Sequence, residues 1–313
     1  MLYVNGERVP MKRFPNNEIY LDFMDKDARK PGGQPTGLFH KNNLPENEQE
    51  PIWVGLQYES SDDIVGLGLL VDWLRDMGYE ELKLSMPYIP YSTMDHIDKE
   101  KSRPLSLRSM ARFINSLNFR KVVVMEPHSA VSEAMIDRLE VIDQTMELFN
   151  EAVQDMNLRW SDVIAVFPDE GARKRYEGQL DRIQLWEGGR VRSLTFSKDR
   201  NFDNGKIFRS RCADEMPEFT DDTTCIILDD LCRGGFTFEL AAQELRRNGC
   251  KHIALCVTHL EVVAFQPGKI LREGSCVDKI YATNSCLPNY KELPIPEGGK
   301  LTLANRGTYP FID

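Results

Sequence analysis

Short apolar runs alternate with helical apolar patterns along most of the chain, and the clearest pair lies in residues 225–247. Residues 225–228 are apolar throughout, which is typical of a buried strand. Leu240, Ala241 and Leu245 then recur on one face of a helix. The pattern predicts a buried strand followed closely by an amphipathic helix.

The same alternation continues on both sides of this pair. Further strands are predicted over residues 2–4, 19–23, 52–56, 82–86, 121–125, 163–166, 192–196 and 253–259. Helices are predicted over residues 62–77, 105–117, 133–156 and 173–180, and the third of them is expected to bridge two halves of the chain. Strands that alternate with helices predict the α/β class with mostly parallel sheets.

Ligands bind at the carboxyl ends of the strands in such sheets. Four segments with reactive or charged side chains fall at these ends: residues 87–96, 126–128, 167–175 and 228–237. Two polar segments without periodicity, residues 25–50 and 198–205, are predicted to be loops.

Two adjacent acids, Asp229 and Asp230, follow the strand, and Gly234 and Gly235 precede the helix. Glycines let backbone N–H groups approach a ligand closely, and a helix start carries partial positive charge that suits phosphate. Carboxylates suit sugar hydroxyls, or a Mg²⁺ ion beside phosphates. The element therefore indicates a phosphorylated sugar, although an ordinary strand-to-helix connection with two solvated acids stays open.

Composition narrows the function further. The 313 residues suggest two domains of roughly 150 residues each. The net charge of −10 argues against binding to nucleic acid or to anionic membranes. We find no 18-residue apolar run and no signal or transit peptide, so no membrane span is expected. Seven cysteines without a CxxC motif predict free thiols in the cytoplasm, or in a host's cytoplasm if the chain is phage-encoded.

Six short segments carry a more specific pattern. They read FPNNE at 14–18, PYIPY at 87–91, MEPH at 125–128, VFPDEG at 166–171, KDR at 198–200 and LDDLCRGGFT at 228–237. In this order they resemble the F-x-D-G-E, PYxPY, D-L-H, V-x-P-D-x-G, K-R-R and ribose-phosphate motifs of the ribose-phosphate pyrophosphokinase family (phosphoribosyl-diphosphate synthetases). Each motif alone is weak, whereas six in order indicate the fold strongly and the chemistry less strongly.

The resemblance implies two phosphoribosyltransferase-type domains, with mostly parallel sheets, related by a pseudo-two-fold axis. These domains would be residues 1–142 and 143–285, and the ribose-phosphate loop would lie in the second. Residues 286–313 are expected to form an irregular tail that packs back on the first domain. Family members assemble from paired subunits, so a homo-oligomer, either a dimer or a hexamer, is implied.

The family's reaction moves the β,γ-diphosphoryl group of ATP to the C1 hydroxyl of ribose 5-phosphate, with Mg²⁺. By resemblance, Lys198 and Arg200 are catalytic cations on a loop that closes over the moving phosphates. His128 and Asp169 would hold the metal that bridges the ATP phosphates. Solvated surface cations and a loop histidine satisfied by its neighbours are the alternatives that these residues alone leave open.

The resemblance also assigns the substrate contacts. Asp229 and Asp230 would bind the ribose 2- and 3-hydroxyls, directly or through a second Mg²⁺. The residues implied for the 5-phosphate are Arg233, Gly234, Gly235, Phe236 and Thr237. Those implied for ATP are Phe14, Asn16 and Glu18, which would reach into a neighbouring subunit, together with Thr93, Met94, Asp95 and His96. For Phe14, core packing is the alternative.

Three departures from the family matter. The family follows PYxPY with A-R-Q-D-R, but residues 92–96 read STMDH, so an arginine and a glutamine for ATP are missing. Its ribose-phosphate loop, D-D-x-x-D-T-G-G-T, here contains Arg233, Gly234 and Phe236 in place of an acid, a hydroxyl residue and a glycine. Residues 25–50 are also longer and more polar.

An added cation, a lost side chain and an aromatic surface suggest a larger group on the ribose 5-position, with ADP-ribose as the natural candidate. The sequence is similar in this respect to a phage branch of the family that makes ADP-ribose 1-diphosphate for rebuilding NAD. The prediction is a diphosphokinase that leans to ADP-ribose. Ribose 5-phosphate as acceptor, a phosphoribosyltransferase and a non-catalytic subunit are the alternatives.

Overall fold

The structure is a computed structural model that describes residues 1–23, 39, 44–97, 102–187, 191–200 and 207–305. Within these residues the chain forms two compact units, Met1–Ile142 and Asp143–Asn305. Each unit has its own mostly parallel sheet and its own apolar core, which confirms the predicted α/β class. None of the helices described combines the length and apolar character that a bilayer crossing requires.

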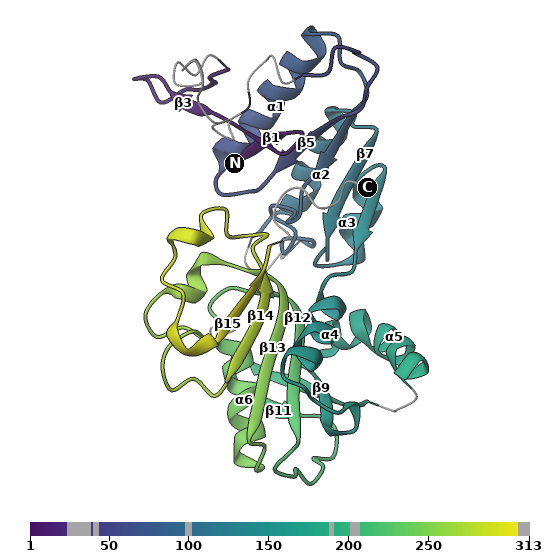
Figure 1. The fold of residues 1–313 in the computed structure, drawn as a ribbon, viewed down its shortest axis with the longest axis vertical. Coiled ribbons are helices and arrows are strands. Elements are labelled where there is room, and N and C mark those ends of the chain that lie inside the picture. Colours follow the sequence, from purple (N-terminus) through teal and green to yellow (C-terminus); the bar gives the residue numbers. More distant parts are fainter. Residues whose placement is uncertain (24–38, 40–43, 98–101, 188–190, 201–206, 306–313) are drawn as a thin grey trace. The chain divides into compact units, whose positions relative to one another are not determined.

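The first unit is built on a sheet with the strand order β2-β1-β5-β6-β7-β8 (Figure 1). Its strands are β1 (Leu2–Val4), β2 (Glu7–Val9), β5 (Ile52–Leu56), β6 (Leu82–Ser85), β7 (Lys121–Met125) and β8 (Leu139–Ile142), of which β5 to β8 run parallel. Its helices are α1 (Ser61–Asp76), α2 (Ser106–Ser116) and α3 (Ala130–Met135). A separate hairpin consists of β3 (Met11–Arg13) and β4 (Ile19–Leu21).

The predicted helix over residues 133–156 is wrong. The structure divides this segment into the end of α3, strand β8 and helix α4 (Thr145–Asp155). Arg138 has a left-handed φ of 56°, which interrupts any helical path. Leu139 and Val141 alternate onto the core of the first unit while β8 pairs with β7. The helical spacing on both sides of this short strand conceals its alternation.

The second unit is built on a sheet with the order β11-β10-β9-β12-β13-β14-β15. Its strands are β9 (Val163–Phe167), β10 (Arg192–Arg200), β11 (Ile207–Cys212), β12 (Thr224–Cys232), β13 (His252–Leu260), β14 (Lys279–Thr283) and β15 (Leu301–Ala304). All neighbours are parallel except β10 and β11. Its longer helices are α4, α5 (Glu170–Glu187) and α6 (Phe236–Arg247).

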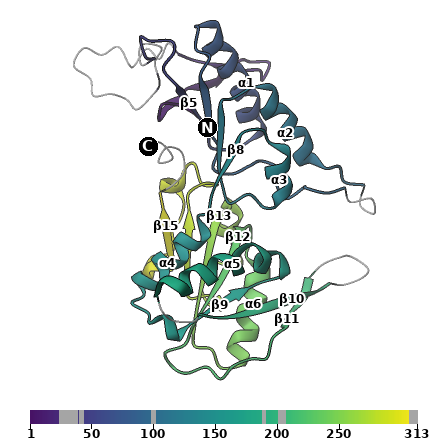
Figure 2. The same ribbon diagram turned by 90° about the vertical axis from the view of Figure 1, so that its right-hand side faces the viewer.

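Strand β12 lies in the middle of this sheet and is covered on both faces (Figures 1 and 2). Cys225 and Ile227 pack in the same core as α6, whereas Ile226 and Leu228 pack with α4 and α5 on the other face. A strand buried on both faces has apolar residues at every position, and this explains the continuous apolar run in the sequence.

The predicted irregular tail differs from what is observed. Leu301–Ala304 forms β15, which pairs in parallel with β14 at the edge of the second sheet. Leu301 and Leu303 pack on the core of that unit. Residues up to Asn305 therefore belong to the second unit rather than to the first, and residues 306–313 lie outside the described part of the chain.

A glycine makes the turn between β12 and α6 possible. Gly235 precedes the first residue of α6 and has a φ of 77°, a conformation that L side chains rarely adopt. A Cβ atom there would stand 2.3 Å from the Cβ of Ile270. Ile270 is fully buried, so the core itself demands glycine at this position.

We predict that Gly235→Ala lowers the free energy of unfolding by about 2 to 4 kcal/mol, because backbone strain and overlap with Ile270 add together. Gly249→Ala is the matched control, since Gly249 also has a positive φ, of 96°, but would meet nothing within 4 Å. Urea unfolding followed by circular dichroism measures both losses. Equal losses in the two variants would contradict the role given to Ile270.

Candidate functional site

Asp229 and Asp230 lie near the carboxyl end of β12 and still belong to the strand. β12 pairs with β9 only as far as Ile227, whereas its pairing with β13 continues to Cys232. The acids therefore stand where the strand has lost one neighbour, at the sheet edge where α/β proteins bind ligands. The sequence predicts that the acids follow the strand, whereas the continued pairing with β13 keeps them within it.

Arg175 of α5 bridges the two acids. Its Nη2 atom lies 2.5 Å from Oδ1 of Asp229 and 2.7 Å from Oδ1 of Asp230. The Asp230 side chain is 2% exposed, the Asp229 side chain 13% and the Arg175 side chain 23%. Asp229 is thus the acid with an edge that a ligand can reach, and Asp230 serves mainly as the buried anchor of Arg175.

Burial and mutual repulsion dominate the electrostatics of this trio. Burial and the adjacent Asp230 raise the pKa of Asp229 to about 8, although Arg175 acts in the opposite direction. Burial acts to lower the pKa of Arg175, but the two carboxylates outweigh it and hold that pKa above its ordinary value. One fixed cation therefore serves two closely spaced acids, and it does not fully offset the burial and the repulsion that favour a proton on Asp229.

Buried hydroxyl groups support the backbone beneath Asp229. Thr145 donates through its Oγ1 to the carbonyl oxygen of Asp229 at 3.2 Å and lies 2.8 Å from Oγ1 of Thr258. The Tyr176 hydroxyl donates to the same Thr145 oxygen at 3.3 Å. All three side chains are fully buried, so they fix the end of β12 against α4, α5 and β13.

The glycine loop comprises Arg233, Gly234 and Gly235, and α6 begins at Phe236. Thr237, predicted as a hydroxyl donor of the loop, lies in the first turn of α6 and is half-buried. Phe236 is 60% exposed, which fits the predicted aromatic surface. Arg233 is already engaged, because its Nε lies 3.1 Å from Oε1 of Glu261.

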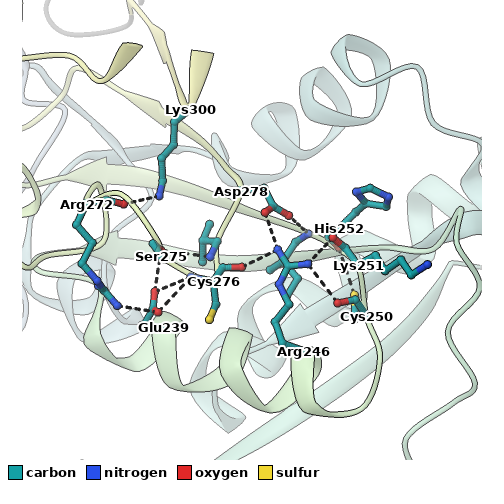
Figure 3. A network of polar contacts seen from close by, with 12 residues as sticks. Glu239, Arg246, Cys250, Lys251, His252, Arg272, Ser275, Cys276, Asp278 and Lys300 are labelled. Carbon is teal, nitrogen blue, oxygen red and sulfur yellow. Dashed lines mark hydrogen bonds and ion pairs between the residues drawn. The ribbon is translucent and has the colours of Figure 1, made fainter. Parts of the chain in front are cut away.

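A buried acid fastens the neighbouring segment to α6 (Figure 3). Glu239 accepts from Arg272 Nη2 at 2.8 Å, from Ser275 Oγ at 2.7 Å and from the Cys276 backbone N–H at 3.1 Å. Burial acts to raise the pKa of Glu239, but these donors outweigh it and hold that pKa below its ordinary value. The sequence gives no sign of this network, because Glu239 lies more than 30 positions from its donors.

Asp169 caps the helix that carries Arg175. Its Oδ1 accepts the Ala172 backbone N–H at 2.9 Å, and its carbonyl accepts the Arg173 N–H at 3.1 Å. Asp169 is half-buried between β9 and α5, at a helix N-terminus where an anion is favoured. Its proximity also contributes to the raised pKa of Asp229.

Lys198 and Arg200, predicted on a loop, lie instead in β10, which forms an antiparallel arm with β11. Lys198 pairs with Ser210, and the register shifts between Asp199 and Arg200. The loop prediction fails because pairing with β11 extends a strand through polar residues. The rest of the predicted loop, residues 201–205, lies outside the described part of the chain.

In the first unit, Asp95, His96 and His128 lie together. His96 Nδ1 is 2.9 Å from Oδ1 of Asp95. Burial acts to raise the pKa of Asp95, but hydrogen bonds from Ser129 and His96 and the nearby His128 outweigh it, so that pKa lies below its ordinary value. Met94 has a structural task, since its carbonyl accepts the Leu107 N–H at 3.2 Å. Thr93 is half-buried beside it.

Phe14, Asn16 and Glu18 form the exposed tip of the β3–β4 hairpin. Phe14 is 50% exposed and stacks on Tyr20 with ring centroids 4.3 Å apart. The Phe14 N–H donates to the Glu18 carbonyl at 2.8 Å, and the Glu18 N–H donates to Asn16 Oδ1 at 3.2 Å. Phe14 is therefore not a core residue but part of a rigid, projecting surface.

His128 belongs to the first unit and Asp169 to the second. Among the described residues, no group of three or more His, Cys, Asp or Glu side chains is arranged to hold a metal ion. Mg²⁺ commonly takes one or two carboxylates and completes its coordination with waters and substrate phosphates. A half-buried carboxylate such as Asp169 at a sheet edge fits that pattern.

We predict that Arg175→Met lowers the free energy of unfolding by about 3 to 5 kcal/mol, because the buried acid pair loses the cation that it shares. Arg173→Met, on the same helix but paired only with exposed acids, should leave stability nearly unchanged. Adding Asp229→Asn to Arg175→Met should restore part of the loss. A similar loss for both arginines in urea unfolding would contradict this charge balance.

We predict that Glu239→Gln lowers the free energy of unfolding by about 1 to 3 kcal/mol at pH 7. Because the folded pKa lies below the unfolded one, the ionised carboxylate stabilises the fold above the ordinary pKa of 4.5, and this is lost as pH falls through the folded pKa. The difference between wild type and variant in urea unfolding should therefore shrink below about pH 4.5. Glu244→Gln, which removes one pair with exposed Arg247, should show little change, and a gap for Glu239 that persists at low pH would refute the assignment.

The sequence of the chain is similar to known enzymes. No model of a protein family matches the chain. The chain is 26% identical over 280 residues to a ribose-phosphate pyrophosphokinase of Thermococcus kodakarensis, covering 88% of this chain and 85% of that protein. It is 25% identical over 282 residues to a ribose-phosphate pyrophosphokinase of Pyrococcus furiosus, with the same coverage of 88% and 85%.

A solved structure, the phosphoribosylpyrophosphate synthetase of Mycobacterium smegmatis, supports the fold with a TM-score of 0.63 at 19% identity, over 95% of this chain and 86% of that chain. The sequence alignments extend over nearly the whole chain and so include both units and the edge of β12. The chain is thus similar over nearly its whole length to ribose-phosphate pyrophosphokinases, a family of transferases.

Proposed function

We propose that the protein transfers the β,γ-diphosphoryl group of ATP to the C1 hydroxyl of a ribose 5-phosphate moiety and releases AMP. The observation that carries this proposal is the acid pair held by Arg175 beside the glycine loop, at the carboxyl end of β12. Carboxylates that accept sugar hydroxyls and a loop that offers backbone N–H groups to phosphate are both needed for this acceptor. The relatives named ribose-phosphate pyrophosphokinases support the same reaction.

The acceptor would lie along this edge. The exposed edge of Asp229 accepts a ribose hydroxyl, while Asp230 keeps Arg175 in place. The 5-phosphate lies against the loop that begins at Arg233, where the start of α6 adds partial positive charge. This arrangement leaves the C1 hydroxyl on the side of the sugar away from the loop.

The transfer itself makes one bond and breaks one. The C1 oxygen attacks the β-phosphorus of ATP, and the bond from that phosphorus to the bridging oxygen of the α-phosphate breaks, so AMP leaves. Lys198 and Arg200, carried on the β10–β11 arm, supply positive charge to the moving phosphoryl oxygens. Asp169 would supply a carboxylate to the Mg²⁺ ion that neutralises the ATP phosphates.

The nucleotide contacts belong to the first unit. Asp95 and His96 lie beside His128, and Thr93 and Met94 precede them. We further propose a homo-oligomer, in which the exposed tip at Phe14 contacts the adenine of ATP bound to a neighbouring subunit. The seven cysteines, all free, fit a reducing cytoplasm.

For the acceptor, we propose ADP-ribose ahead of free ribose 5-phosphate. The exposed ring of Phe236 offers a stacking surface beside the loop. Arg233 supports this choice less than its sequence position suggests, because Glu261 already binds it. The names of the relatives favour ribose 5-phosphate, so the two sugars are tested together.

We predict that the protein, with Mg²⁺ and ATP, releases AMP when either sugar is added, faster with ADP-ribose, and releases none without a sugar. Lys198→Ala should lower kcat by at least about 100-fold with little change in KM, because its charge acts on the transition state. Lys251→Ala, whose ammonium pairs with Asp221, is the matched control.

Chromatographic detection of AMP measures these rates. AMP with ribose 5-phosphate only would refute ADP-ribose as the acceptor. The absence of AMP with both sugars would refute the diphosphokinase and favour a phosphoribosyltransferase or a non-catalytic subunit.

A further inference from the structure

We propose that Lys269 binds the phosphoryl group on the sugar's 5-position, and this rests on the proposed function of the glycine loop. Lys269 follows β13 in a segment that packs against the loop, and its side-chain stem crosses Gly234. A Cβ atom at Gly234 would lie 3.1 Å from Cδ and 3.8 Å from Nζ of Lys269. The ammonium group thus stands directly beside the backbone that receives the phosphate.

The Lys269 side chain is not engaged by the described part of the chain, whereas Arg233 is already paired. Arg233, the cation that the sequence singles out in the loop, binds Glu261 at 3.1 Å. The half-buried Lys269 side chain makes neither an ion pair nor a hydrogen bond with any part of the chain that the structure describes. A half-buried ammonium without a counter-charge, beside backbone donors, is suited to an anionic phosphoryl group.

The backbone that carries Lys269 is fixed in position. The Ile270 N–H donates to the Gly234 carbonyl at 3.2 Å, which joins the two segments directly. Arg272, held by Glu239, donates to the Lys269 carbonyl at 3.3 Å (Figure 3 shows the Glu239–Arg272 contact). Lys300 donates to the Arg272 carbonyl at 3.0 Å. The ammonium group therefore starts from a rigid base, so that little backbone ordering is needed when phosphate binds.

Gly234 and Lys269 form a coupled pair. A side chain at position 234 would occupy the space of the Lys269 stem, and this flexible stem would have to move away from the loop. The absence of a side chain at 234 and the position of the Lys269 stem thus depend on each other. The pair replaces a neutral hydroxyl donor with a full positive charge at the loop.

The test is the affinity for each sugar without ATP, measured by isothermal titration calorimetry with ribose 5-phosphate and with ADP-ribose. Lys269→Met should raise Kd at least tenfold for the accepted sugar, and in the AMP assay should raise KM with kcat within about twofold. Lys251→Met, at the opposite end of β13 and paired with Asp221, is the control and should change neither. An unchanged Kd in Lys269→Met would overturn the proposal.

A second variant shows that the effect belongs to the loop. Gly234→Ser should raise Kd in the wild-type background but add nothing in Lys269→Met, because the lysine it displaces is already gone. Equal effects in both backgrounds would contradict the coupling. Wild-type protein that binds a sugar but releases no AMP would refute the proposed reaction and leave the lysine test intact. Wild-type protein that binds neither sugar would refute both.

Discussion

The balance between one arginine and two adjacent acids is the constraint on which the second unit depends. Asp229 and Asp230 extend beyond the part of β12 that β9 covers, and Arg175 joins them from α5. Leaving both carboxylates in this buried place without a cation would be costly, so α5 must hold its orientation against the sheet. The Asp169 cap and the hydroxyls around Thr145 serve the same end, because they fix the two elements that the ion pair joins.

The two adjacent acids have different surroundings and therefore different roles. Asp230 is enclosed and anchors the cation, whereas Asp229 keeps an exposed edge for the ligand. The same division recurs at the glycine loop, where Arg233 is bound by Glu261 and Lys269 remains available. In both places one charged group is used for structure, and a neighbour is thereby left in position for binding.

Local patterns predict most of the fold and only part of the site. Buried strands such as β12 and β13 are evident as apolar runs, and the acids and glycines between β12 and α6 mark the ligand edge. The short β8 is lost between helical patterns, and the strand character of Lys198 depends on pairing with β11. Arg175 and Lys269 are not predicted, because Arg175 meets Asp229 from 54 positions away and three adjacent cations in α5 look alike in sequence. Only the packed structure shows which cation faces which acid.

In the proposed reaction a diphosphoryl group, rather than a single phosphoryl group, moves from ATP to the sugar. The most direct test supplies ATP with ¹⁸O in the non-bridging oxygens of the β- and γ-phosphoryl groups. The sugar product is then analysed by mass spectrometry. We expect a sugar that carries both labelled groups on C1, together with unlabelled AMP. A sugar that carries only the γ-group, with ADP as the other product, would contradict it.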